Sequence, residues 1–153
     1  MKKLRIFIDM DGVISDFAKS AEKEAAERGI TKLSRPDLCV DYRYLDLIEG
    51  AEEAVKYLYD NHEVFIATTP PWDRIQVWAD KRAWLEENFP YLKQRLIFTH
   101  RKDLLIGDIL IDDSHYRGQP DFKGHWFWFN KSWENKNWKA CLEFIKILEN
   151  EEI

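Results

Sequence analysis

The sequence predicts an α/β protein in which a parallel β-sheet is covered by helices on both faces. Short apolar runs, typical of strands buried on both faces, alternate with segments whose apolar residues recur at helical spacing. Polar residues follow several of these runs, and ligands of open α/β sheets bind beyond the carboxyl ends of the strands. A length of 153 residues is consistent with a single domain.

The predicted elements follow one another along the chain, with one irregular stretch near its start. The apolar runs predict strands over residues 4–9, 63–69, 95–99, 108–113 and 126–129. Helical periodicity predicts helices over residues 15–28, ended by Gly29, then 50–60, 73–88, capped by Asp73, and 136–148. Residues 16–47 exceed a simple crossover, so we expect them to form a small helical cap over the end of the first strand.

The aromatic content is high, and most of the seven tryptophans are expected to pack helices against the sheet. Trp72 is the expected exception, because it follows the second strand and precedes a helix. The inward side of that helix is expected to consist of Ile75, Val77, Trp78, Ala79, Ala83, Trp84 and Leu85.

The composition argues against several classes of protein. A formal net charge of −5 disfavours a nucleic-acid polymer as partner, because such binding needs a basic patch. Cys39 and Cys141 lack the spacing of metal ligands and are expected to be reduced thiols. No apolar run is long enough for a signal peptide or for a membrane span of roughly 20 residues. We therefore expect a cytoplasmic protein without a membrane partner, whose oligomeric state, for example a homodimer, the sequence does not fix.

The first predicted strand ends in a pair of aspartates. Asp9 closes the apolar run, Asp11 follows two residues later, and Gly12 allows the backbone to turn sharply. Two carboxylates are costly to desolvate, so a buried strand would not keep them at its end without a function. Binding of a metal ion and a phosphate is a function that suits them. The ordinary alternative is a simple turn, since Asp and Gly are also turn residues.

Other predicted strands also end in residues that a phosphoryl-transfer site requires. Thr68 and Thr69 end the second strand, Lys102 lies in a basic cluster after the third, and Asp112 and Asp113 end the fourth. Each residue alone has an ordinary explanation: a β-branched strand end, a solvated lysine or a turn cap. Their joint occurrence at successive strand ends favours a functional site.

These motifs resemble those of the haloacid dehalogenase-like superfamily and, within it, the 5'(3')-deoxyribonucleotidase family. The resemblance spans nearly the whole chain. It is carried by Ile8-Asp9-Met10-Asp11-Gly12-Val13, by Val64-Phe65-Ile66-Ala67-Thr68-Thr69-Pro70, by Lys102 with Asp108-Ile109-Leu110-Ile111-Asp112-Asp113, and by Tyr44-Leu45-Asp46-Leu47 before Gly50-Ala51.

The resemblance implies a three-layer Rossmann-type fold with five parallel strands in the order 5-4-1-2-3. It also implies a magnesium-dependent phosphatase, with Asp9 as the nucleophile that forms an aspartyl-phosphate and Asp11 as the acid and base. Further implied roles are phosphate binding by Thr68, Thr69 and Lys102. The Mg²⁺ ligands are implied to be the Asp9 carboxylate, the Asp11 backbone carbonyl and Asp112, with Asp113 in support.

The implied substrate is a small phosphomonoester, most simply a nucleoside monophosphate. The cap is shorter than that of the family, and the aromatic or imidazole side chains available to contact a base are Phe17, Tyr42, Tyr44, Trp72 and His100. Packing within the cap is the ordinary role for these aromatics, and a solvated turn is an equal explanation for His100.

Three alternatives remain open at this point. A phosphatase for another small phosphomonoester, such as a sugar phosphate, uses the same chemistry. A receiver-like signalling module also combines acidic residues, Thr and Lys at strand ends, but its acidic pair precedes the phosphate-accepting aspartate. A non-catalytic binding module would have no need of an acid and base at Asp11.

Overall fold

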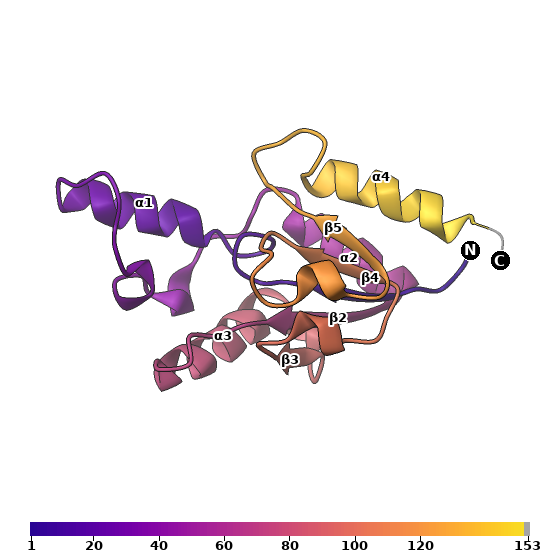
Figure 1. Ribbon diagram of the computed structural model, residues 1–153, viewed down its shortest axis with the longest axis horizontal. Helices are drawn as coiled ribbons and strands as arrows, with labels where there is room; N and C mark the ends of the chain where they lie inside the picture. Colours follow the sequence, from indigo (N-terminus) through magenta and orange to yellow (C-terminus); the bar gives the residue numbers. More distant parts are fainter. Residues whose placement is uncertain (152–153) are drawn as a thin grey trace.

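The structure is a computed structural model that describes residues 1–151. Its centre is a five-stranded, wholly parallel sheet in the order β3-β2-β1-β4-β5, which is the expected order viewed from the other side (Figure 1). The strands are β1 (Arg5–Ile8), β2 (Glu63–Thr68), β3 (Leu96–Phe98), β4 (Ile109–Asp112) and β5 (His125–Trp128). All five predicted strands are confirmed, with ends that differ by at most one residue.

The four predicted α-helices are also present. They are α1 (Phe17–Glu27), α2 (Ala51–Asn61), α3 (Ile75–Asn88) and α4 (Trp138–Glu149). The sequence pattern missed five short 3₁₀ helices, η1 (Pro36–Leu38), η2 (Tyr42–Tyr44), η3 (Pro90–Leu92), η4 (Lys102–Leu104) and η5 (Gln119–Asp121). Each is a single turn, which is too short to produce a helical period.

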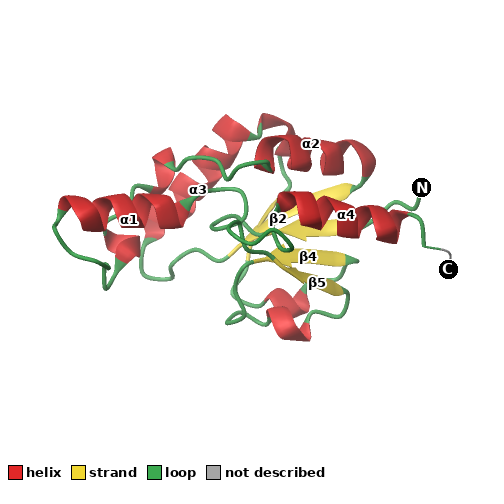
Figure 2. Cartoon of the chain, turned by 90° about the horizontal axis from the view of Figure 1, so that it is seen from above, coloured by secondary structure: helices red, strands yellow, loops and turns green. Residues whose placement is uncertain are grey.

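The two faces of the sheet are covered differently. On one face, alternate strand residues such as Ile6 and Ile66 join the main hydrophobic core with the buried sides of α2, α3 and α4. On the other face, Phe7 and Leu110 pack against Phe122. One-turn helices lie beside β5 on this side of the sheet (Figure 2). The links from β3 to β4 and from β4 to β5 are too short for an α-helical crossover, so one-turn helices form this second layer.

The beginning of α3 differs from the prediction. Arg74, not Asp73, is the N-cap residue, and it makes no side-chain capping bond. Asp73 instead lies 3.5 Å from the guanidinium of Arg35. Ile75 is 84 % exposed, whereas Lys81 is buried on the helix face that contacts the core. The expected apolar side of this helix was therefore wrong at Ile75 and Ala79, which are exposed, and it left out Lys81.

The prediction that most tryptophans lie in the core is also wrong. Trp84 and Trp138 are fully buried, and their indole N–H groups donate to the carbonyls of Leu45 and Val13, as a buried indole requires. The tryptophans with large exposed fractions are Trp72, Trp128 and Trp133. Trp72 was expected to be exposed, and Trp128 is exposed because β5 is an edge strand.

Residues 16–47 project from one end of the sheet as a small helical lobe built on α1 (Figure 1). The two segments that connect this lobe to the core lie side by side, since Asp16 N–H donates to Asp46 O and Ile48 N–H donates to Ile14 O. Lys131, from the segment after β5, forms an ion pair of 2.5 Å with Asp16, the N-cap of α1. The lobe is thereby fixed to the core on two sides.

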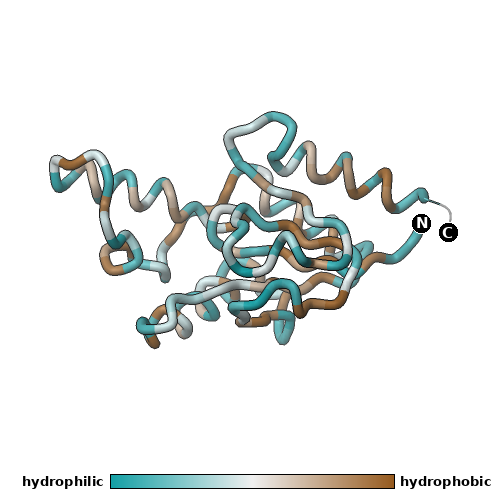
Figure 3. Tube along the Cα trace, in the orientation of Figure 1, coloured by the Kyte–Doolittle hydropathy of each residue, from teal (hydrophilic) through white to brown (hydrophobic). Residues whose placement is uncertain are grey.

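The termini meet at the opposite end of the molecule, where Lys2 N–H donates to Glu149 O. Hydrophobic residues concentrate in the strands and alternate with polar ones along α4 (Figure 3). Cys39 and Cys141 are unpaired among the described residues. In residues 1–151, none of the helices has the length and apolar character to cross a membrane.

Candidate active site

The predicted site residues come together at the carboxyl ends of β1, β2 and β4. A cavity of about 530 Å³ opens there. It is lined by Asp9, Asp11, Thr68, Thr69, Lys102, Asp112, Asp113, Ser114, Tyr116, Arg117 and Gln119. All seven catalytic, metal, phosphate-binding and supporting residues expected from the sequence are therefore in one place, although more than a hundred positions separate the first from the last.

Lys102 is the centre of this cluster. Its buried ammonium lies 3.2 Å from Asp9 Oδ1 and 2.5 Å from Asp112 Oδ2, and it donates to the Ala67 carbonyl at 2.9 Å. Burial alone lowers the pKa of a lysine, but the two carboxylates outweigh this and raise the pKa of Lys102. Lys102 therefore stays charged while buried.

Asp11 is held by partners that the sequence analysis did not identify. Lys81 Nζ lies 2.6 Å from Asp11 Oδ2 and 3.0 Å from Thr68 Oγ1, and Ser15 Oγ donates to Asp11 Oδ1 at 2.9 Å. Lys81 is buried on α3 between Val77 and Trp84. A lysine on the apolar stripe of a helix was the available signal, because such a position is costly without an acidic partner.

The acidic residues crowd one another. Carboxylate oxygens of Asp9, Asp112 and Asp113 all lie within 4.8 Å of one another. Desolvation, followed by repulsion from Asp9, raises the pKa of Asp113 to about 9. Burial likewise raises the pKa of Asp9, against the opposing effect of Lys102. An all-oxygen set of three acidic groups at this spacing fits a hard divalent cation such as Mg²⁺.

Gly12 makes this crowding sterically possible. Its φ is +83°, a left-handed conformation that favours glycine. A Cβ atom at this position would lie 1.9 Å from Asp113 Oδ2, so the backbone approaches the Asp113 carboxylate more closely than any side chain allows. Gly12 thus allows both the turn after β1 and the close approach of Asp113, which follows β4.

The two threonines differ in what they offer to a ligand. Thr69 Oγ1 donates to the Thr99 carbonyl at 2.7 Å, so its hydroxyl hydrogen is engaged by the backbone. Thr68 Oγ1 accepts from Lys81, which leaves its own hydrogen free to be donated into the cavity. Thr68 is therefore the better placed of the two for phosphate binding.

The five expected substrate contacts do not line the cavity. Tyr42 is buried with its ring 5.3 Å from that of Phe17, and Tyr44 is 74 % exposed. Trp72 and His100 form an aromatic cluster with ring centroids 5.8 Å apart, and His100 Nε2 lies 3.0 Å from the Pro70 carbonyl. Their roles as substrate contacts remain predictions.

Comparison with known proteins agrees with this geometry. A sequence model for the family described as "5' nucleotidase, deoxy (Pyrimidine), cytosolic type C protein" matches residues 31–142. The chain belongs to this family. It is accordingly a phosphatase. The fold also resembles that of a haloacid dehalogenase-like family hydrolase from Xanthomonas campestris, with a TM-score of 0.56, 13 % identity and 96 % of both chains covered.

Individual relatives of this nucleotidase family member extend over most of its length. A candidate 5'(3')-deoxyribonucleotidase of Vibrio phage KVP40 is 30 % identical, covering 92 % of this chain and 83 % of its own. A candidate enzyme of the same name from Staphylococcus epidermidis is 31 % identical, with 74 % and 76 % covered. The human 5'(3')-deoxyribonucleotidase, cytosolic type, is 28 % identical, with 92 % and 82 % covered.

Replacing Gly12 tests whether this nucleotidase-family site depends on the close approach of Asp113. We expect Gly12→Ala to reduce phosphate release by about 10²-fold, because a displacement of about 1 Å at a reacting site has an effect of that size. Gly29→Ala is the matched control, since Gly29 also has a positive φ (+69°) but no atom within 4 Å of an added Cβ. Equal activity loss in both variants, measured beside their thermal stability, would attribute the effect to backbone strain alone.

The raised pKa of Asp113 predicts a pH-dependent stability of the metal-free protein. Its proton is bound more tightly in the folded state than in the unfolded state, where the pKa is near 3.8. Folding stability from this group is therefore full below that value and is lost as the pH rises toward about 9. Asp113→Asn should remove the loss, so the variant should gain over the wild type as pH increases, by about 1 kcal/mol or less because solvent screens this rim position.

Thermal unfolding in EDTA between about pH 5 and about pH 9 measures this difference. The exposed Asp121→Asn variant is the control and should show no pH-dependent gain. A stability difference for Asp113→Asn that is constant over the whole pH range would contradict the expected titration.

Proposed function

We propose that the protein is a magnesium-dependent 5'(3')-deoxyribonucleotidase that dephosphorylates nucleoside monophosphates through an aspartyl-phosphate on Asp9. The observation that carries this proposal is the buried Lys102 ammonium between Asp9 and Asp112, with Asp11 on the same strand end. The names of the phage, staphylococcal and human relatives support the choice of substrate.

In this proposal, Asp9 acts as the nucleophile. Its carboxylate faces the cavity and contacts Lys102 through one oxygen. In the first step, an Asp9 oxygen bonds to phosphorus while the bond from phosphorus to the ester oxygen breaks. Thr68 donates to the phosphoryl oxygens, on which negative charge is spread in the transition state.

In this proposal, Asp11 transfers the proton. As a carboxylic acid it protonates the departing alkoxide, and as a carboxylate it then takes a proton from the water that attacks the aspartyl-phosphate. That second step releases inorganic phosphate and restores Asp9. Lys81 and Ser15 orient Asp11 through its two oxygens, and the Ser15 hydroxyl can donate to the ionised form or accept from the protonated one.

The residues present fit Mg²⁺. Asp9, Asp112 and the Asp11 backbone carbonyl would hold it, and Asp113 offers a further oxygen within the same cluster. When bound, the ion supplies positive charge that keeps these carboxylates ionised and reduces their repulsion toward a phosphate dianion.

We further propose that residues 16–47 act as the cap of this site. The lobe is held at the end of β1 and is anchored by Lys131. Tyr42 lies within it, 5.4 Å from the Lys81 ammonium, so the lobe closes over the Asp11 side of the site. Of the five side chains expected to contact the substrate, Trp72 is the most exposed, at 77 %, and is therefore the most accessible to a base. A cytoplasmic location and the oligomeric state remain predictions.

A phosphatase for a smaller ester, such as a sugar phosphate, is the second candidate. One observation favours it: none of the aromatic side chains expected to contact a base lines the cavity. A smaller leaving group needs no such contact, so the two functions separate on a substrate panel.

Phosphate release from deoxyribonucleoside monophosphates, ribonucleoside monophosphates and sugar phosphates, with and without Mg²⁺, tests the proposal. We expect hydrolysis that requires Mg²⁺ and prefers the nucleotides. Asp9→Asn should reduce it by at least about 10³-fold, because an amide cannot replace the nucleophile. Asp60→Asn, at the exposed end of α2, should retain the wild-type rate. Near-normal turnover in Asp9→Asn would show that Asp9 is not the nucleophile, and a preference for sugar phosphates would favour the second candidate.

A further inference from the structure

The two buried lysines at the site, Lys102 and Lys81, donate their hydrogen bonds to other groups of the protein. An ammonium has three N–H groups. Those of Lys102 are directed at Asp9, Ala67 O and Asp112. The N–H groups of Lys81 are directed at Asp11, Thr68 and, at 4.0 Å, the sulfur of Met10, and Lys81 is not among the residues that line the cavity. Neither lysine has an N–H group left for the substrate in this arrangement.

Arg117 is the second positively charged residue that lines the cavity. Its guanidinium has five N–H donors and stays charged at any physiological pH. Across residues 1–151, the ion pairs and hydrogen bonds found include none made by this side chain. The nearby Arg101, by contrast, is paired with Asp103 at 2.6 Å. Arg117 therefore offers a free cationic group to the cavity.

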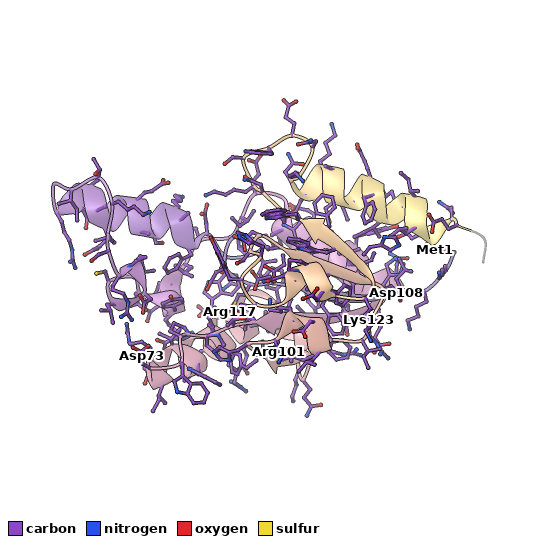
Figure 4. All side chains as sticks on the ribbon, in the orientation of Figure 1. Met1, Asp73, Arg101, Asp108, Arg117 and Lys123 are labelled. Carbon is purple, nitrogen blue, oxygen red and sulfur yellow. The ribbon has the colours of Figure 1, made fainter. Side chains whose placement is uncertain are left out.

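The backbone of Arg117 is fixed to that of Lys102. Lys102 N–H donates to the Arg117 carbonyl at 2.6 Å, and Arg117 N–H donates to the buried Gln119 side chain at 2.7 Å. Gly118 follows with a φ of +88°, and a Cβ atom there would lie 2.3 Å from Asp103 Oδ1. These contacts hold the loop after β4 against η4, at the end of the core nearest the 16–47 lobe (Figure 4).

The charges of the residues that line the cavity indicate what this free guanidinium can bind. Four carboxylates line the cavity, whereas Lys102 and Arg117 are its only two cationic residues in the described chain. A phosphate dianion that enters the cavity is repelled by the carboxylates at short range. A planar guanidinium presents two parallel N–H groups that match two phosphate oxygens.

We propose that Arg117 binds the phosphoryl group of the substrate. This inference rests on the proposed phosphatase chemistry at Asp9. Arg117 moves no proton and forms no covalent bond; it donates hydrogen bonds to phosphoryl oxygens that do not leave. If Arg117 instead contacts the leaving group, the kinetic comparison below gives a loss confined to the nucleotide.

Titration of the protein with inorganic phosphate in the presence of Mg²⁺, followed by calorimetry, measures this contact without turnover. We expect Arg117→Ala to weaken phosphate binding by roughly 10- to 100-fold, the range for a hydrogen bond to a charged group. Arg117→Lys should retain part of the affinity, because lysine keeps the positive charge but lacks the two parallel N–H groups of the guanidinium. Lys123→Ala removes an exposed cation at the other end of the core and should bind as the wild type does.

Steady-state kinetics with p-nitrophenyl phosphate and with a deoxyribonucleoside monophosphate complete the experiment. Both substrates share the phosphoryl group and differ in the leaving group, so Arg117→Ala should reduce kcat/KM equally for the two. Unchanged phosphate affinity, absence of phosphate binding to the wild type, or a loss confined to the nucleotide would overturn the proposal. If the wild type hydrolyses neither ester, the proposed function fails, while the phosphate titration still decides the role of Arg117.

Discussion

The buried ammonium of Lys102 is the interaction on which the rest of the site depends. It links Asp9 after β1, the Ala67 carbonyl on β2 and Asp112 at the end of β4, so one side chain connects three neighbouring strands. Removing a partner from a buried ion cluster leaves an uncompensated charge, which typically costs about 3–5 kcal/mol. Lys102 therefore stabilises the Asp9 and Asp112 carboxylates at the strand ends.

The position of β1 at the centre of the sheet explains why these groups meet. Its neighbours are β2 and β4, and the order β3-β2-β1-β4-β5 places residues from the start, middle and end of the chain at one edge. Lys81 makes a second buried pair with Asp11, so each aspartate of the first motif has its own lysine. The two aspartates therefore have different surroundings, as the proposed mechanism requires of a nucleophile at Asp9 and a proton-transfer group at Asp11.

The sequence was informative where one residue type has few alternatives. Aspartates that end apolar runs identified the strand ends, and with them Asp9, Asp11 and Asp112, whereas Lys102 came from the basic cluster after the third strand and from the family resemblance. Lys81 was missed because a lysine is ordinarily solvated, although its spacing from Val77 and Trp84 places it on the buried stripe of α3, where its long aliphatic stem allows it to lie. Trp128 and Ile75 show the opposite error, since hydrophobic character alone does not determine which positions the fold covers. The position of Arg117 at the cavity depends on backbone contacts between two loops, which no local sequence pattern predicts.

A crystal structure obtained with Mg²⁺ and beryllofluoride, a mimic of a phosphoryl group on a carboxylate, tests the central claim most directly. The account predicts beryllium bonded to the Asp9 carboxylate, with Mg²⁺ beside it in contact with Asp112, and Lys102 still bridging the two aspartates. Beryllofluoride on another residue, or a cation bound away from Asp9 and Asp112, would contradict it.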